Sequence, residues 1–123
     1  MASIDESSRQ LWTDYIDLLL VHWPRVSAPL EAQIAGLNPA EQAGKARHIG
    51  VSNHNAAMFS AAVALSDHPL VTNQVEYHPH LNQSTLLAEI RSRASNFMAY
   101  CPMTVGRVFE DLLLSRIAVV CVE

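Results

Sequence analysis

The sequence predicts an α/β fold in which four short strands form one parallel sheet and helices connect them. The first observation is an unbroken apolar run, from Leu18 to Val21, that lacks helical periodicity and is too short to span a membrane. The second is the alternation of strand-like and helix-like segments at a nearly constant interval, which implies right-handed crossovers between parallel strands. The third is that each predicted strand ends in polar residues.

The composition predicts one globular domain over residues 1–123. Half of the 123 residues are hydrophobic and 16% are charged, and a chain of this length buries roughly two thirds of its unfolded surface. The net charge of -4 and the lack of a Lys/Arg cluster give no electrostatic support for nucleic-acid binding. Two cysteines, Cys101 and Cys121, without a signal-peptide pattern, predict a reducing, cytoplasmic setting with no membrane anchor.

The first unit of the fold is built around the apolar run. Residues 3–11 are expected to form the last turns of a helix that leads into a strand over 17–22, buried on both faces, with His22 at its end. Ser27 is the expected N-cap of the next helix. Pro39 is expected to interrupt that helix, because a proline in a helix interior costs about 3 kcal/mol.

The same pattern repeats through the rest of the chain. The predicted elements are a strand at 48–52, a helix at 56–65, a strand at 70–75, a helix at 81–94, a strand at 97–101 and a helical tail from 109. Either Ser52 or Asn53 is expected to cap the helix at 56–65. Four strands are too few to close the eight-stranded barrel to which such a repeat usually belongs.

Polar side chains follow each predicted strand at its carboxyl end. They are His22, Ser52, Asn53, Gln74, Glu76, Tyr100 and Cys101. Parallel neighbours would bring these ends to one rim, where a histidine, an amide pair and an aromatic face could surround a flat polar ligand. Each residue also has a structural alternative, since a strand-end histidine can bond a carbonyl, Ser52-Asn53 can cap a helix and Tyr100 can fill the core.

The segment His78-Pro79-His80 raises the alternative of a metal site. Ligands on either side of a proline point apart, and no Cys or carboxylate set has zinc-like spacing, so we expect no metal. Cys101 lies beside the predicted rim, but no Cys-His pattern selects it as a nucleophile, and a buried, inert thiol is expected.

Four ordered motifs resemble successive signatures of the aldo-keto reductases. They are DYIDLLLVHWP at 14–24, GKARHIGVSN at 44–53, NQVEYHP at 73–79 and AYCP at 99–102. Their order and spacing cover nearly the whole chain, and they are similar to bacterial members of the group that includes 2,5-diketo-gluconic acid reductases. The resemblance implies a partial (β/α)8 (TIM) barrel of about four βα units, which uses NADPH to reduce aldehydes and ketones to alcohols.

The resemblance also assigns roles at the barrel rim. It implies that His22 orients and polarises the substrate carbonyl, while Trp23 lines the substrate pocket. The nicotinamide carboxamide would be held by Ser52, Asn53 and Gln74. These assignments fit the physics, because a planar ring needs amide partners before its hydride can be aimed at a carbonyl.

The remaining assignments concern the fourth predicted strand and the segment after it. The Tyr100 ring would stack on the nicotinamide, and Cys101 and Met103 would follow the pyrophosphate, where the family usually has serine and leucine. His54 stands where the family has phenylalanine, and Pro39 stands where relatives continue a helix.

The resemblance further implies that the chain is an internal fragment of the barrel. The family's proton-donating tyrosine, its lysine and its aspartate lie on strands before this chain begins, and the segment that holds the adenosine 2'-phosphate lies after it ends. The expected activity of the chain alone is therefore weak or absent. Two alternatives stay open: a non-catalytic half-barrel that self-associates through open sheet edges, and a polypeptide with no stable fold.

Overall fold

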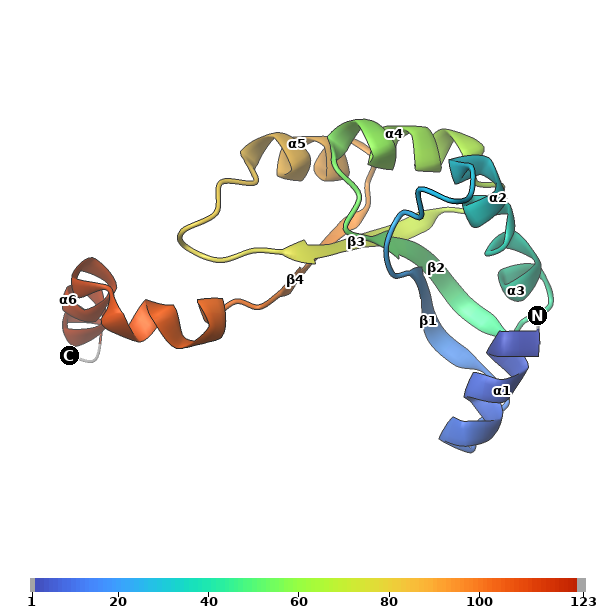
Figure 1. The fold of residues 1–123 in the computed structure, drawn as a ribbon, viewed down its shortest axis with the longest axis horizontal. Coiled ribbons are helices and arrows are strands. Elements are labelled where there is room, and N and C mark those ends of the chain that lie inside the picture. Colours follow the sequence, from blue (N-terminus) through green and yellow to red (C-terminus); the bar gives the residue numbers. More distant parts are fainter. Residues whose placement is uncertain (1, 122–123) are drawn as a thin grey trace.

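The computed structural model describes residues 2–121, which form a single four-stranded parallel sheet with helices packed on one of its faces (Figure 1). The strands are β1 (Ile16–Val21), β2 (Ala46–Ser52), β3 (Leu70–Glu76) and β4 (Asn96–Tyr100). Each strand pairs in parallel with the next in the order β1-β2-β3-β4. The predicted α/β fold with parallel strands is confirmed, with strand boundaries shifted by one or two residues.

Helices and one 3-10 segment connect or flank the strands. They are α1 (Ala2–Leu11), α2 (Leu30–Ala35), α3 (Asn38–Gln42), α4 (Ala56–Leu65), α5 (Ser84–Ser92), the 3-10 helix η1 (Thr104–Glu110) and α6 (Leu112–Val120). The predicted break at Pro39 is confirmed, because this proline lies in the first turn of α3, where its missing N–H costs nothing. The helix expected over 81–94 is shorter, and Ala94, with a φ of 53°, lies beyond its end.

Both predicted helix caps are wrong. Pro29 occupies the N-cap position of α2 and no side chain caps that helix, so Ser27 is not its N-cap. At α4 the cap is Asn55, whose Oδ1 accepts a hydrogen bond from the Met58 N–H at 2.9 Å. The chain therefore makes a three-residue turn between β2 and α4, and Ser52 and Asn53 are left for other partners.

The hydrophobic core lies between the sheet and the helices on its covered face. Ile34 of α2, Phe59 of α4 and Ile90 of α5 are fully buried against it, together with Ile49 and Val51 of β2. Successive strand residues point to opposite faces, so the residues that alternate with Ile49 and Val51 face away from these helices.

The expectation that the first strand is buried on both faces is wrong. Asp17 is exposed and the other residues of β1 are only half-buried. Within the described residues its only sheet neighbour is β2, and helices α2, α4 and α5 lie over one face of the sheet. On the other face Gly50 is tightly enclosed, since an added Cβ would lie 2.7 Å from the Thr72 carbonyl oxygen and 2.9 Å from Leu20.

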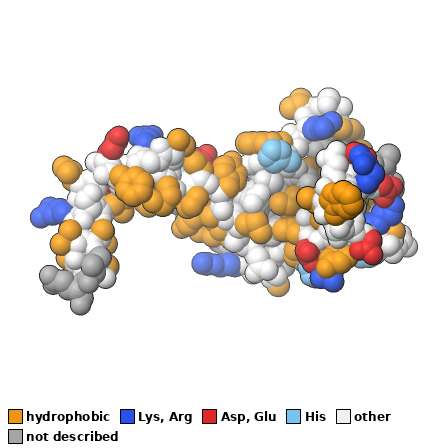
Figure 2. Space-filling view, turned by 90° about the horizontal axis from the view of Figure 1, so that it is seen from below, with side chains coloured by type: hydrophobic (Ala, Val, Ile, Leu, Met, Phe, Trp, Pro, Cys, Tyr) orange, Lys and Arg blue, Asp and Glu red, His pale blue; other side chains and the backbone are white. Residues whose placement is uncertain are grey.

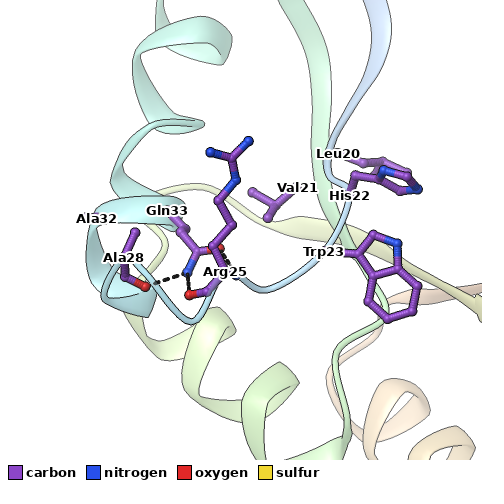
Figure 3. A pocket seen from close by; sticks show the side chains of 8 residues that line it. All are labelled: Leu20, Val21, His22, Trp23, Arg25, Ala28, Ala32 and Gln33. Carbon is purple, nitrogen blue, oxygen red and sulfur yellow. Dashed lines mark hydrogen bonds between the residues drawn. The ribbon is translucent and has the colours of Figure 1, made fainter.

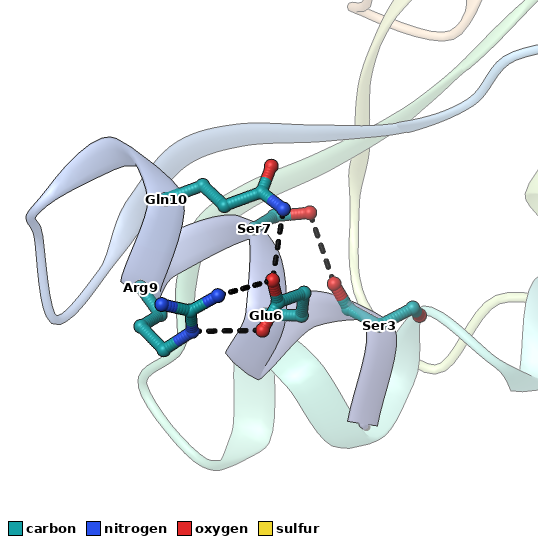
Figure 4. A network of polar contacts seen from close by, with 5 residues as sticks. All are labelled: Ser3, Glu6, Ser7, Arg9 and Gln10. Carbon is teal, nitrogen blue, oxygen red and sulfur yellow. Dashed lines mark hydrogen bonds and ion pairs between the residues drawn. The ribbon is translucent and has the colours of Figure 1, made fainter.

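Helix α1 carries a polar network on its surface (Figure 4). The Arg9 guanidinium donates to both carboxylate oxygens of Glu6, at 2.9 and 2.6 Å, and Gln10 donates to the same carboxylate at 2.8 Å. The hydrogen bond from Arg9 lowers the pKa of Glu6. These contacts support the helix locally, whereas Ile4 and the ion pair between Asp5 and Lys45 attach it to the rest of the fold.

The chain after β4 forms an arm that extends away from the sheet (Figure 1). Its first turn contains four residues with positive φ: Cys101 (53°), Thr104 (52°), Val105 (54°) and Gly106 (93°). This conformation is strained for a β-branched residue. No residue of α6 is buried, and apolar side chains gather along the arm in Figure 2; they include Val105, Phe109, Leu112, Leu113, Ile117, Val119 and Val120.

The core can be tested with two phenylalanines in opposite surroundings. Phe59 is fully buried and Phe109 is 74% exposed. We expect Phe59→Ala to lower the free energy of unfolding by about 3–5 kcal/mol and Phe109→Ala to change it by less than about 0.5 kcal/mol. Urea denaturation followed by circular dichroism measures both. A wild-type chain without a cooperative transition would show that no such core forms.

Candidate functional site

The carboxyl ends of the four strands meet at one edge of the sheet, where the sequence-predicted site residues are found. In register, Val21 of β1 lies opposite Val51, Ser52 lies opposite Gln74, and Glu76 lies opposite Tyr100. His22 follows β1 directly, and Asn53 follows β2. Parallel pairing therefore brings residues from four separate segments to one rim.

Asn53 joins three of these strand ends through its side-chain carboxamide. Its Nδ2 donates to the main-chain oxygen of His22 at 3.0 Å and to Ser52 Oγ at 3.1 Å. Its Oδ1 accepts from the Tyr100 hydroxyl at 2.8 Å. The residue has a φ of 61°, a left-handed conformation that asparagine tolerates better than most residues.

Ser52 and Gln74 complete this hydrogen-bonded set. Ser52 is buried, and its Oγ donates to the Gln74 carbonyl oxygen at 2.8 Å, which also accepts from the Asn53 N–H at 2.9 Å. The Gln74 side-chain nitrogen lies 3.0 Å from the Met98 sulfur. A thioether is a weak acceptor, so a stronger acceptor on a ligand could replace it.

His22 and Trp23 lie at the end of β1 and line a pocket with the loop that follows (Figure 3). Their ring centroids are 6.3 Å apart and tilted by 60°, and both side chains are exposed. The opposite wall is held by Gln33, which accepts from the Arg25 N–H at 2.9 Å and donates to the carbonyls of Arg25 and Ala28 at 3.1 and 2.8 Å. An imidazole and an indole thus lie beside a loop that the Gln33 side chain links through three hydrogen bonds.

Cys101 and Met103 lie on the turn that leaves β4, outside the Asn53 set. Cys101 is half-buried rather than buried as expected, and the Met103 side chain is 47% exposed. Their main-chain oxygens accept from Thr104 and Gly106 within the turn. Their predicted place along a pyrophosphate stays a prediction.

The histidines of the His78-Pro79-His80 segment each face a different carboxylate. His78 Nε2 lies 3.1 Å from Glu76 Oε1, and His80 Nε2 lies 3.7 Å from Asp111 Oδ2. Over residues 2–121 no three His, Cys, Asp or Glu side chains are grouped as a metal site. In the same range no helix is both long and apolar enough to cross a membrane.

Sequence reasoning missed two buried polar residues behind the rim, Asn73 and His54. Asn73 has no exposed surface; its Nδ2 donates to the His54 carbonyl at 2.8 Å, and its Oδ1 accepts from the His54 N–H at 3.4 Å. An asparagine within a buried strand is the signal that could have found this pair, since a buried amide must have partners.

The His54 ring is buried beside the rim with one nitrogen bonded. Its Nδ1 lies 2.9 Å from the Ser52 carbonyl oxygen, and its Nε2 has no partner. A carbonyl only accepts, so Nδ1 carries a proton and donates it to this bond. Burial lowers the pKa of His54, and the bond to the Ser52 carbonyl opposes that shift only in part.

Comparison with known proteins identifies the family. The family model described as the Aldo/keto reductase family matches residues 1–113. The chain belongs to this family. Its four strands are accordingly a part of the family's (β/α)8 barrel, as the sequence predicts.

Among curated members of the aldo/keto reductase family, the chain is 32% identical over 121 residues to methylglyoxal reductase DkgB of Salmonella typhi, covering 95% of this chain and 45% of that protein. It is 35% identical over 118 residues to an aldo-keto reductase of Mycobacterium avium (strain 104), covering 94% of this chain and 41% of that protein. The chain therefore spans less than half the length of these relatives.

Solved structures of the family superimpose on most of the chain. A candidate 2,5-diketo-D-gluconic acid reductase B gives a TM-score of 0.91 at 47% identity, covering 94% of this chain and 41% of its own. A Bombyx mori aldo-keto reductase in complex with NADP gives a TM-score of 0.76 at 35% identity, covering 81% of this chain and 35% of its own.

The lowered pKa of His54 predicts a stability that depends on pH. Unfolding restores the ordinary value of 6.5, so the unfolded chain binds more protons below that pH and the free energy of unfolding falls as the pH drops. His54→Phe removes this term. Urea denaturation between about pH 7.5 and pH 5.5 should show that the free energy of unfolding falls more steeply with decreasing pH in the wild type than in His54→Phe. An equal pH dependence in the two proteins would contradict the lowered pKa of His54.

Proposed function

We propose that this chain carries the nicotinamide-facing and carbonyl-facing part of an NADPH-dependent reductase that converts aldehydes and ketones to alcohols. The observation that carries the proposal is the Asn53 carboxamide, which joins the ends of β1, β2 and β4 beside the His22 pocket. A relative named methylglyoxal reductase and a solved relative with bound NADP support the reaction and the cofactor.

The rim residues fit a nicotinamide carboxamide by their chemistry. That group offers two N–H donors and one carbonyl acceptor, and Ser52, Asn53 and Gln74 together present both donors and acceptors. Tyr100 adds a flat aromatic ring within hydrogen-bond distance of Asn53, suited to stacking on a planar ring. We propose these four as cofactor-binding residues, with Cys101 and Met103 on the segment that would follow the pyrophosphate.

NADPH, when bound, supplies a hydride to the carbonyl carbon. Within this chain, His22 is the residue proposed to act on the carbonyl oxygen. Its imidazole can donate a hydrogen bond to that oxygen, where negative charge develops as the hydride is transferred. Trp23 forms the neighbouring wall, and its exposed indole can hold an apolar part of the substrate against that bond.

The reaction also needs one proton at the carbonyl oxygen to complete the alcohol. None of the described residues that line the His22 pocket is a tyrosine. Loss of a positioned general acid typically lowers the reaction rate by roughly 10²–10⁴-fold. The rate that we propose for this chain by itself is therefore low, even with cofactor and substrate bound.

The substrate class that we propose is small aldehydes and ketones. Methylglyoxal is the first test compound, because one relative is named a methylglyoxal reductase and another is named a reductase of 2,5-diketo-D-gluconic acid, which is also a dicarbonyl. The setting that we propose is reducing and cytoplasmic, in keeping with two free thiols at Cys101 and Cys121.

The cofactor assignment is tested by removing the stacking ring. We expect Tyr100→Ala to weaken NADPH binding by about 1–3 kcal/mol, the usual worth of an aromatic stack, and Tyr100→Phe to retain most of the affinity because it keeps the ring. Tyr15→Ala is the matched control: this tyrosine lies beside Arg47, just before β1. Energy transfer from tryptophan to NADPH reports binding; equal affinities of wild type and Tyr100→Ala would contradict the assignment.

The reaction is tested by NADPH oxidation with methylglyoxal at high protein concentration. We expect slow turnover by the wild type and none by His22→Ala, since His22 is the proposed partner of the carbonyl oxygen. His48→Ala is a control at a strand residue away from the rim, in register with Leu18. Turnover that survives in His22→Ala would refute the role of this histidine.

A second candidate is supported by the open sheet. Strands β1 and β4 each pair on one side only within the described residues, and on the face away from the helices Leu18 and Met98 line a hollow. Unpaired strand edges and uncovered apolar side chains favour pairing with another chain. We propose self-association through this face and these edges as the alternative, non-catalytic role.

Self-association is tested by sedimentation velocity over a range of protein concentrations. We expect the wild type to grow in size with concentration and Leu18→Lys to remain a monomer, because a buried lysine would be left unpaired at the interface. Val26→Lys is the matched control, since Val26 is fully exposed on the loop after β1. A single size for the wild type across the range would rule this alternative out.

A further inference from the structure

Asn73 is a polar residue at the centre of the fold. It has no exposed surface, lies in β3 opposite Val51, and is surrounded in sequence by the core residues Leu70 and Val75. The Asn73 carboxamide bonds both main-chain groups of His54. It donates to the His54 carbonyl at 2.8 Å and accepts from the His54 N–H at 3.4 Å. The side chain thus acts as a local backbone partner for the turn after β2.

This contact fixes one side of Asn53. On the other side, the Asn53 N–H itself donates to the Gln74 carbonyl at 2.9 Å. The peptide groups on both sides of the Asn53 α-carbon are therefore hydrogen-bonded to adjacent residues of β3, Gln74 on one side and Asn73 on the other. Between these two attachments it adopts a φ of 61°, a left-handed conformation that residues other than glycine generally disfavour and that asparagine adopts when local hydrogen bonds support it.

The His54 ring adds a third attachment across the same residue. Its Nδ1 donates to the Ser52 carbonyl at 2.9 Å, so the residues on both sides of Asn53 are tied to each other. The left-handed backbone turns the Asn53 carboxamide towards Tyr100, whose hydroxyl lies 2.8 Å from Oδ1. The direction of that carboxamide therefore depends on contacts made behind the rim.

We propose that Asn73 is a positioning residue, which holds Asn53 in its left-handed conformation and so directs the carboxamide that receives the nicotinamide. The effect on cofactor binding rests on the proposed function; the effect on the conformation of Asn53 does not. A purely structural role for Asn73 would stabilise the fold without changing the Asn53 backbone.

The test uses Asn73→Leu, which removes both bonds to His54 and keeps the core filled. The matched control is Thr72→Val on the same strand. Thr72 is also buried, and its hydroxyl also bonds a main-chain carbonyl, that of Asn96 at 3.0 Å. Asn73→Asp, measured at a pH where the carboxyl is ionised, serves if the leucine variant does not fold, because an isosteric carboxylate can still accept from the His54 N–H but cannot donate to its carbonyl.

The first readout is the carbon-13 chemical shifts of Asn53 in the labelled chain, which distinguish left-handed from extended backbone. We expect these shifts to leave the left-handed range in Asn73→Leu, or in Asn73→Asp in its place, and to stay unchanged in Thr72→Val. A folded Asn73 variant that keeps the left-handed shifts overturns the proposal. So does an equal displacement in Thr72→Val.

The second readout is the dissociation constant for NADPH. If the competent conformation falls to about a tenth of the population, the constant rises about tenfold, whereas Thr72→Val should change it less than about twofold. If the wild type binds no NADPH, the proposed function has failed, and the Asn53 shifts alone decide the positioning role. Unchanged affinity in a variant whose Asn53 has left the left-handed range overturns the link to the cofactor.

Discussion

Parallel pairing of β1 to β4 in chain order is the constraint on which both the fold and the site depend. Because every crossover returns the chain to the same end of the sheet, each strand delivers its last residue to one rim. That geometry places Tyr100 within hydrogen-bond distance of Asn53, 47 positions earlier in the sequence. Without the common direction of the strands, these side chains would lie at opposite ends of the molecule.

The same pairing leaves two features of the described chain without partners. Helices α2, α4 and α5 lie over one face of the sheet, and within the described residues the other face and both edge strands remain open. The arm after β4 adds a helix in which no residue is buried. Apolar surface of this extent tends to be covered by further protein. The chain matches less than half the length of its curated relatives, and an aldo/keto reductase barrel has strands beyond the four seen here.

Buried polar groups, rather than the apolar core, determine the detailed shape of the rim. Ser52, His54 and Asn73 are all buried at the junction of β2 and β3. Their side chains bond the main-chain oxygens of Gln74, Ser52 and His54, respectively. A buried amide without partners is costly, so such a set has few alternative arrangements. The one unbonded atom of this group, His54 Nε2, is where the arrangement is most sensitive to protonation.

The sequence by itself determined the order and type of the elements, because these follow from local patterns. Apolar runs gave four strands, Pro39 broke a helix where expected, and polar residues marked the strand ends that carry His22 and Tyr100. The motifs also indicated the family, which the comparison confirms. Signals of this kind lie within a few residues of the position that they describe, so a single chain is enough to read them.

Only the tertiary structure decided which partner each polar side chain takes. Asn53 does not cap α4, since Asn55 does, and it bonds instead to residues 31 and 47 positions away. Asn73 begins one of the four motifs but received no role from the sequence, and the structure shows its side chain bonded to the turn that follows Asn53. The half-burial of β1 likewise depends on which faces other elements cover. The physical reason is the same in each case: hydrogen bonds and burial depend on neighbours in space, which local sequence patterns do not specify.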